Sequence, residues 1–258
     1  MMRAPTLHAG LCIARYTLVE ALRNRLLWLF GAGALGVLGL SSFLHALALT
    51  ESAQLETAVL AALLRLVSIF LIATFVITSM VRESADKGAE LLLALPLPRA
   101  VYLLGKLAGF GALALLPAVL SGLLASWFAP PAQAALWAAS LLCELWIVAA
   151  FSLLCALTLQ QTLPALAAAG AFYLLARAVA TFQLLGQSAA ATPLQRTLDH
   201  GIDAIALLLP HLDRFTRSDW LVYHNGGAAE LAAIALQSAI YVGLLAAAAL
   251  FDLYRKNI

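Results

Sequence analysis

The sequence predicts an all-α polytopic membrane protein with six transmembrane helices, an N-terminal interfacial helix and a short cytoplasmic helix. Of its 258 residues, 64% are hydrophobic and only 11% are charged, whereas soluble domains carry about a quarter charged residues. Apolar runs of about 20 residues, the length that crosses a bilayer core, recur along the chain. Helices are expected because an open sheet edge would leave backbone groups unpaired in lipid.

The net charge and the cysteines exclude several classes of site. A net charge of +2 gives no indication of a nucleic-acid partner. Cys12, Cys143 and Cys155 show no CxxC spacing, so neither a disulfide framework nor a zinc site is expected. The histidines and aspartates within residues 186–228 match no recognised metal-ligand spacing, and no metal site is predicted.

The first predicted element is an interfacial helix at residues 7–25. Leu7, Leu11, Leu18 and Leu22 fall on one helical face, and arginines flank that face. This distribution is typical of a helix that lies flat at a membrane surface.

Six apolar stretches follow, and together with the interfacial helix they form one predicted transmembrane domain over residues 1–258. They comprise residues 26–49, 57–81, 103–127, 134–158, 163–185 and 229–251. Residues 186–228 are predicted to form an extracytoplasmic segment. No internal repeat is evident, so an inverted-repeat transporter is not indicated.

Orientation follows from Lys and Arg, which are enriched on the cytoplasmic side of membranes. With the N-terminus inside, the inner segments contain Arg3, Arg15, Arg23, Arg25, Arg82, Lys87, Arg99, Lys106, Arg255 and Lys256. The outer segments contain Arg196, Arg214 and Arg217. The chain is therefore predicted to be a multi-pass protein of the inner (cytoplasmic) membrane, in contact with lipid, with both termini in the cytoplasm.

The inner loop at residues 82–102 is unusual because it is both charged and rich in leucine. A helix is predicted at 84–95, with Asp86 near its N-terminus, where the helix dipole favours a carboxylate, and with Pro96 ending it. Leu91 and Leu92 lie on a face suited to a groove on a partner protein. Beyond it, Arg99 and Lys106 begin the next span, where their side chains are expected to snorkel towards lipid phosphates.

The stretch "RESADKGAELLLALPLPRAVYLLGKL" resembles the first intracellular loop of ABC-2 type transporter permeases. That loop typically has an acidic residue, Gly, Thr, Glu, a Leu run, Pro, and Arg before Gly-Lys. The matching residues are Glu83, Gly88, Glu90, Leu91, Leu92, Pro96, Arg99, Gly105 and Lys106. Ala89 departs from the pattern, since Thr is usual there. The stretch "LLPHLDRF" resembles the NosY-like branch, and the N-terminal helix is similar to the family's connecting helix.

The resemblance implies the permease subunit of an ATP-driven exporter. Two permease copies, here a homodimer, would pair with two copies of a separate ATPase subunit that binds ATP and Mg²⁺; a periplasmic partner is a further option. The residues implied in ATPase coupling, through a coupling helix at 84–95, are Glu83, Asp86, Lys87, Gly88, Glu90, Leu91, Leu92, Pro96 and Arg99. The chain itself is expected to be no enzyme, because Ala100 and Leu107 stand where a P-loop needs Gly and Ser or Thr.

Three ionisable residues, Arg65, Glu144 and Arg177, fall inside predicted spans. Charge in lipid is costly and usually functional, so one interpretation is a polar lining of the substrate path. The other is a structural clamp between Glu144 and Arg177 on adjacent helices. Two other functions stay open: a non-transporting membrane scaffold that anchors a cytoplasmic ATPase, and an ion-coupled carrier that uses the three intramembrane charges.

Overall fold

The computed structural model describes residues 3–23, 26–47, 52–86, 98–187 and 209–255. These residues form helices and connecting turns, and no strand occurs within those ranges. The elements are α1 (Arg3–Arg23), α2 (Leu26–Leu47), α3 (Ser52–Ala85), α5 (Arg99–Ala125), α6 (Pro131–Leu159), α7 (Thr162–Gln187), the 3₁₀ turn η1 (Leu212–Arg214), α9 (Asp219–Val222) and α10 (Ala228–Arg255). The all-α prediction is confirmed for the described residues.

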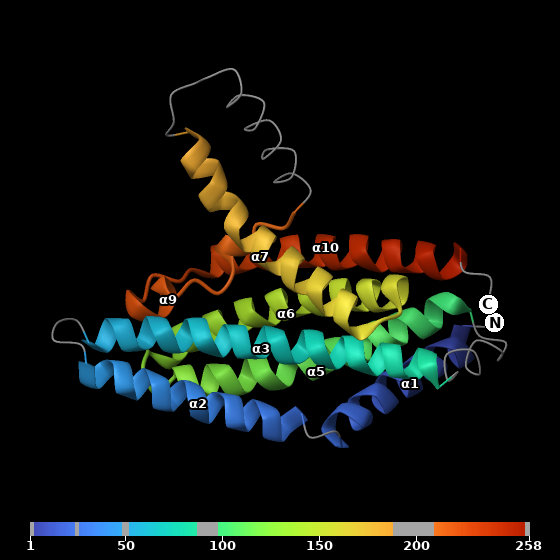
Figure 1. Ribbon diagram of the computed structural model, residues 1–258, viewed down its shortest axis with the longest axis horizontal. Helices are drawn as coiled ribbons and strands as arrows, with labels where there is room; N and C mark the ends of the chain where they lie inside the picture. Colours follow the sequence, from blue (N-terminus) through green and yellow to red (C-terminus); the bar gives the residue numbers. More distant parts are fainter. Residues whose placement is uncertain (1–2, 24–25, 48–51, 87–97, 188–208, 256–258) are drawn as a thin grey trace.

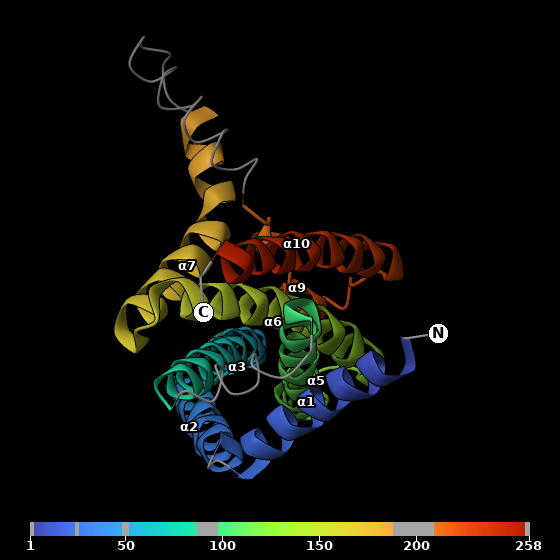
Figure 2. The same ribbon diagram turned by 90° about the vertical axis from the view of Figure 1, so that its right-hand side faces the viewer.

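The long helices form a bundle around α6. Figure 1 shows α3, α5, α6 and α10 running side by side along the long axis of the molecule, and Figure 2 shows α6 between α10 and the pair α3 and α5. Helix α6 packs on α10, α5, α3 and α7, while α2 packs mainly on α3 and α1 mainly on α5. Helix α7 begins beside α6, and its C-terminal part projects away from the bundle (Figure 1).

Five of the described helices are long and apolar enough to cross a membrane. They are Gln54–Ala85, Arg99–Ala125, Pro131–Leu159, Thr162–Val179 and Ala228–Arg255. The described apolar stretch of α2, Trp28–Leu40, is shorter than a span. The structure is therefore compatible with a multi-pass membrane protein of five spans, and the sixth span predicted at residues 26–49 stays a prediction.

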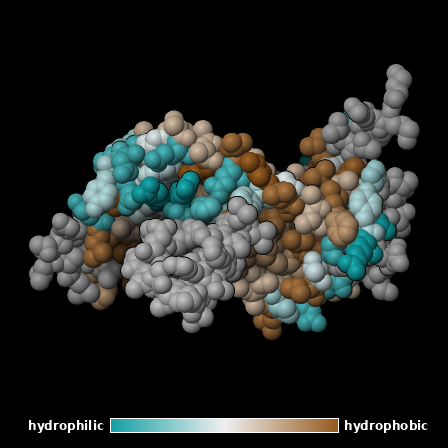
Figure 3. Space-filling model, turned by 90° about the horizontal axis from the view of Figure 1, so that it is seen from above, coloured by the Kyte–Doolittle hydropathy of each residue, from teal (hydrophilic) through white to brown (hydrophobic). Residues whose placement is uncertain are grey.

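The connections gather at two ends of the bundle. One end of the bundle, which we call the basic end (right in Figure 1), contains the start of α1, the ends of α3 and α10, the start of α5 and the turn at Gln160. The turn at 126–130 and the segment 209–227 lie at the opposite, distal end. In Figure 3, hydrophobic side chains occupy the middle of the visible face and hydrophilic ones gather on either side of it.

The boundary between α3 and the predicted cytoplasmic helix needs a correction. Ser84 and Ala85, assigned from the sequence to a helix at 84–95, are the last residues of α3. Asp86 follows that helix, and its backbone N–H donates to Arg82 O at 2.9 Å. Asp86 therefore directly follows a helix C-terminus, where the dipole disfavours a carboxylate, and the rest of the predicted helix lies outside the described residues. Helix α3 continues this far because its last turns contain neither Pro nor Gly.

Helix α1 crosses α5 at two glycines. A Cβ atom added at Gly109 would lie 2.8 Å from Thr17 Cβ and 2.9 Å from Ala14 O, and one at Gly105 would lie 2.9 Å from Gly10 O. Small residues at this spacing allow close approach of membrane helices. Helix α1 thus turns its small side chains towards α5.

Gly109→Leu is expected to separate α1 from α5 and to lower the thermal stability of the detergent-solubilised protein. Overpacking typically costs about 1–3 kcal/mol, and here the clash includes the backbone oxygen of Ala14. The matched control is Gly36→Leu on α2, where an added Cβ meets nothing within 4 Å. Equal melting temperatures for the two variants, measured by size-exclusion chromatography after heating, would mean that the glycine contact contributes nothing.

Candidate functional site

The predicted ATPase-coupling residues divide into two groups. Glu83, Asp86 and Arg99 are described by the structure. The others lie outside the described residues, and they are Lys87, Gly88, Glu90, Leu91, Leu92 and Pro96. The structure therefore gives the two ends of the loop, one on α3 and one on α5.

These two ends are joined by an ion pair between Glu83 of α3 and Lys106 of α5. Lys106 Nζ contacts Glu83 Oε2, and the hydroxyl of Tyr102 donates to Glu83 Oε1 at 3.1 Å. Lys106 is 1% exposed and Tyr102 is also buried. Removing one partner of such a buried pair leaves the other charge uncompensated, which is strongly unfavourable. Glu83 therefore holds α3 and α5 together at the base of the loop.

The expectation that Lys106 snorkels towards lipid phosphates is wrong for the structure. Lys106 lies about two helical turns into α5, and its ammonium group points to α3 instead of the membrane surface. A lysine reaches the surface only where its stem runs along the outside of a helix, and this side chain is on the face that packs against α3.

Arg99, the first residue of α5, connects that helix to the end of α10. Its Nη1 donates to Leu253 O at 2.8 Å, and its guanidinium carbon lies 6.0 Å from the centre of the Tyr254 ring. A cation beside the last carbonyls of a helix is favourable because these carry the negative end of the helix dipole. Arg99 therefore ties α10 to the start of α5, and this contact replaces the predicted one with lipid phosphate.

The three intramembrane charges come together near the distal end, although they lie on three helices. Arg177 Nη1 of α7 lies 3.3 Å from Glu144 Oε1 of α6, so the predicted pairing of these two residues is present. Glu144 is completely buried and Arg177 is 24% exposed. Arg65 of α3 does not reach this carboxylate directly; its Nη1 donates to the backbone oxygen of Thr216 at 3.2 Å. We call Arg65, Glu144, Arg177 and Thr216 the polar cluster.

Thr216 is the centre of the polar cluster, and sequence reasoning did not identify it. Its hydroxyl donates to Glu144 Oε2 and its backbone N–H donates to Ser140 Oγ at 2.9 Å. Its φ of 44° lies in the left-handed region, which is uncommon for a side chain other than Gly. Arg177 Nη1 of α7 also donates to the hydroxyl at 3.5 Å. The backbone groups and hydroxyl of this buried residue are thus bound by side chains of α3, α6 and α7.

Arg177 also binds the segment that precedes Thr216. Its Nη1 donates to Leu212 O at 2.7 Å and to Phe215 O at 3.1 Å, and both Leu212 and Phe215 have no exposed surface. The only sequence signal for this segment was the resemblance of "LLPHLDRF" to the NosY-like branch. The arrangement fastens the distal segment to α3, α6 and α7.

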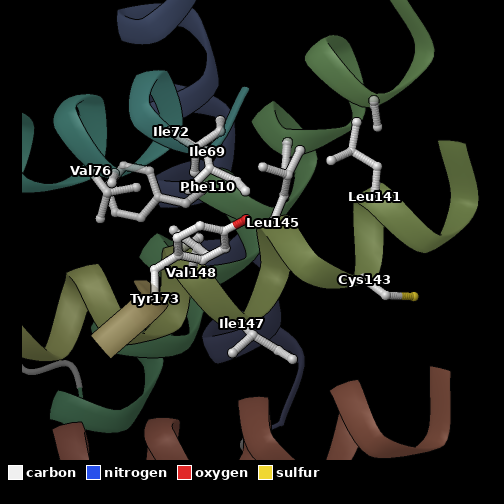
Figure 4. Packing of buried hydrophobic residues seen from close by; sticks show 14 of the residues in the cluster. Ile69, Ile72, Val76, Phe110, Leu141, Cys143, Leu145, Ile147, Val148 and Tyr173 are labelled. Carbon is white, nitrogen blue, oxygen red and sulfur yellow. The ribbon is translucent and has the colours of Figure 1, made fainter. Parts of the chain in front are cut away.

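The polar cluster lies next to a hydrophobic core made by α3, α5, α6 and α7. Figure 4 shows Tyr173 reaching from α7 towards Leu145 of α6, with Phe110 and Ile72 beyond it. Tyr173 is buried, and its hydroxyl lies beside the Glu144 carboxylate and Arg65. Glu144 and Arg177 thus lie between packed apolar residues and the protein groups to which they are hydrogen-bonded. A structural clamp is therefore a better supported role for them than a polar lining of the substrate path.

Sidedness is tested by introducing single cysteines in a chain whose native Cys12 is replaced by Ser. Lys256→Cys should react with a membrane-impermeant maleimide only in inverted vesicles, and Gln195→Cys only in intact cells, because the charge distribution places them on opposite sides. Labelling of both from the same side would contradict the predicted topology. Cys143 and Cys155 are buried and serve as the unlabelled background.

Comparison with known proteins adds no family: no family model and no curated protein matches this chain. The family resemblance therefore depends on the residues of the loop, the N-terminal helix and the distal "LLPHLDRF" stretch.

Proposed function

We propose that this chain is the permease subunit of an ATP-driven ABC-2 type exporter. It works as a homodimer in the inner (cytoplasmic) membrane, with both termini and the loop at 86–98 on the cytoplasmic side. Two copies of a separate ATPase subunit bind there, and ATP and Mg²⁺ belong to that subunit. The substrate path lies between the two permease copies.

The observation that carries the proposal is the contact between Glu83 and Lys106. Both residues belong to the loop pattern by which the chain resembles ABC-2 type permeases, and they flank the residues expected to dock on the ATPase. In the structure they meet as a buried ion pair. A loop that only connected two spans would not need a buried ion pair at its base, since such a pair carries a large desolvation cost.

The contacts at the basic end suggest how movement of the loop reaches the membrane helices. The Glu83–Lys106 pair joins the loop to α3 and α5, Arg99 joins it to α10, and the glycine contact joins α5 to α1. Closure of the ATPase dimer would displace the loop and, through these contacts, four helices together. Switching of this kind needs rigid elements that move as units, because packed interfaces shift between discrete arrangements.

The alternatives differ from this proposal in what they require of the chain. An ion-coupled carrier would use Arg65, Glu144 and Arg177, but Glu144 accepts hydrogen bonds from Arg177 and Thr216 and has no exposed surface. A scaffold would use the same loop to hold an ATPase without transporting anything. No observation on the described residues favours either alternative over the exporter.

The test is ATP hydrolysis in membranes. Tagged chain extracted under mild conditions should retain an ATPase subunit, and after reconstitution the turnover of that subunit should change when a translocated compound is added. A scaffold predicts an ATPase whose turnover no compound alters. A carrier predicts movement of substrate in ATP-depleted vesicles under a proton gradient. Either result would contradict the exporter.

A further inference from the structure

A cavity of about 700 Å³ lies at the basic end between α1, α3 and α5. Helix α1, which crosses α5 (Figure 2), contributes part of its lining. Charged side chains enter it from all three helices: Glu20 from α1, Arg82 and Glu83 from the last turn of α3, and Lys106 from α5. Asp86 completes the charged lining, and the rest of the wall is mainly apolar, including Ile13 and Tyr16.

The Lys106 ammonium indicates that the cavity holds a hydrogen-bond acceptor. Lys106 lines the cavity and is 1% exposed. Its Nζ is paired with the Glu83 carboxylate, and no second acceptor for it occurs among the described residues. An ammonium carries three donors, and a buried donor without a partner is costly. An acceptor inside the cavity would satisfy the remaining donors of Lys106, and Arg82 also lines the cavity.

Two carboxylates of the lining, Glu20 and Asp86, would be balanced by a cation in the cavity. Glu20 accepts a hydrogen bond from Ser79 at 3.2 Å, and Asp86 is exposed at the mouth. Glu83 is paired with Lys106. Arg82 is therefore the one cationic residue of the described lining left to balance Glu20 and Asp86. A purely anionic ligand would meet both carboxylates, and a purely cationic one would meet Lys106 and Arg82.

We propose that this cavity binds the headgroup of a zwitterionic phospholipid with a primary amine, namely phosphatidylethanolamine. The phosphate accepts from Lys106 and Arg82, and the ammonium donates to Glu20 and Asp86. Its acyl chains lie along the apolar wall beside Ile13 and Tyr16. The cavity lies at the ends of α3 and α5, which are long and apolar enough to cross a membrane, and the ends of such helices meet the headgroup region of a bilayer. The proposal does not depend on the ATPase, so it stands or fails independently of the exporter assignment.

The lipid-binding test uses the full purified chain, delipidated in detergent and titrated with phosphatidylethanolamine, phosphatidylcholine or phosphatidylglycerol of identical acyl chains. Native mass spectrometry measures the bound fraction. Cys12 supplies a second readout, because its exposed thiol lines the cavity while Cys143 and Cys155 are buried. Phosphatidylethanolamine should bind most tightly and slow alkylation of Cys12. Phosphatidylcholine has no N–H to donate, and phosphatidylglycerol has no cation for the carboxylates.

Two substitutions in the cavity lining test whether the lipid binds there. Glu20→Gln should raise the apparent Kd for phosphatidylethanolamine about tenfold, as expected for one lost charge-assisted hydrogen bond. Cys12→Trp should block the cavity without altering its charges, which keeps the test valid if Glu20→Gln does not fold. The control is Arg15→Gln, an exposed α1 residue outside the cavity lining. Equal affinity for the three lipids, or unchanged affinity in the folded Glu20→Gln and Cys12→Trp proteins, would overturn the proposal.

Discussion

Glu144→Gln is expected to lower the melting temperature of the purified protein more than any other single neutralisation within the described spans. Glu144 is completely buried, and its two oxygens accept from Arg177 and from the Thr216 hydroxyl. Its loss leaves Arg177 without its counter-charge and weakens the attachment of Thr216 to α6. Breaking a buried pair costs about 3–5 kcal/mol in soluble proteins, and less in lipid, where charged groups find water. Thermal unfolding in detergent measures the effect.

Exchange of the two partners should fail to rescue the protein. A charge pair that acted alone would be restored by Glu144→Arg with Arg177→Glu. Arg177 also donates to the backbone oxygens of Leu212 and Phe215, and a carboxylate at that position would repel both. A restored melting temperature in the double variant would show that only the charge pair matters.

The matched control for Glu144→Gln is Asp219→Asn. Asp219 forms an ion pair with Arg217 at 3.0 Å, and both side chains are 47% exposed. Exposed pairs contribute about 0–1 kcal/mol because water screens them. Asp219→Asn should therefore leave the melting temperature almost unchanged, and a drop as large as that of Glu144→Gln would contradict the role given to burial.

Glu90→Lys and Leu92→Ala are expected to abolish retention of the ATPase subunit and, with it, transport. The sequence predicts that this stretch docks on the ATPase with a leucine anchor and flanking charges, and a few well-packed residues dominate such interfaces. Leu92→Ala removes anchor area, and Glu90→Lys reverses a charge. Both positions lie between the spans that the sequence predicts at 57–81 and 103–127, so permease abundance in the membrane should stay normal. Co-purification and quantitative immunoblotting measure the two quantities.

Two controls separate docking from general damage to the permease. Gln195→Ala, in the predicted extracytoplasmic segment, should leave the ATPase bound. Arg99→Ala should reduce retention less than Glu90→Lys, because Arg99 contacts the end of α10 instead of the predicted docking face. If the ATPase stays bound and coupled in both Glu90→Lys and Leu92→Ala, the loop only connects two helices and does not dock on the ATPase.

The sequence revealed charges in unusual places but not the contacts that those charges make. Arg65, Glu144 and Arg177 stand out because each interrupts an apolar run. Thr216 gives no comparable signal, since a threonine in a polar segment is ordinary. Its role depends on a tertiary contact with Ser140 and Glu144, which no spacing rule encodes.

The sequence indicates whether a residue belongs to a span better than it indicates how far along the helix that residue lies. Lys106 was placed at the lipid surface because it begins an apolar run, yet α5 starts at Arg99 and carries Lys106 inward to Glu83. The helix began earlier than hydropathy indicated because Arg99 is stabilised by α10. Gly105 and Gly109 were visible as a motif, but such spacings arise by chance in an Ala-rich chain, and only the packing of α1 distinguishes them.

Native mass spectrometry of the complex extracted from its own membrane tests the central claim most directly. The exporter account predicts one assembly that contains two copies of this 27.2 kDa chain and two copies of an ATPase subunit. Dissociation should release the ATPase before the permease dimer separates, and Glu90→Lys should yield the permease dimer alone. A wild-type chain that leaves the membrane without an ATPase, under conditions that preserve its own fold, would contradict the account.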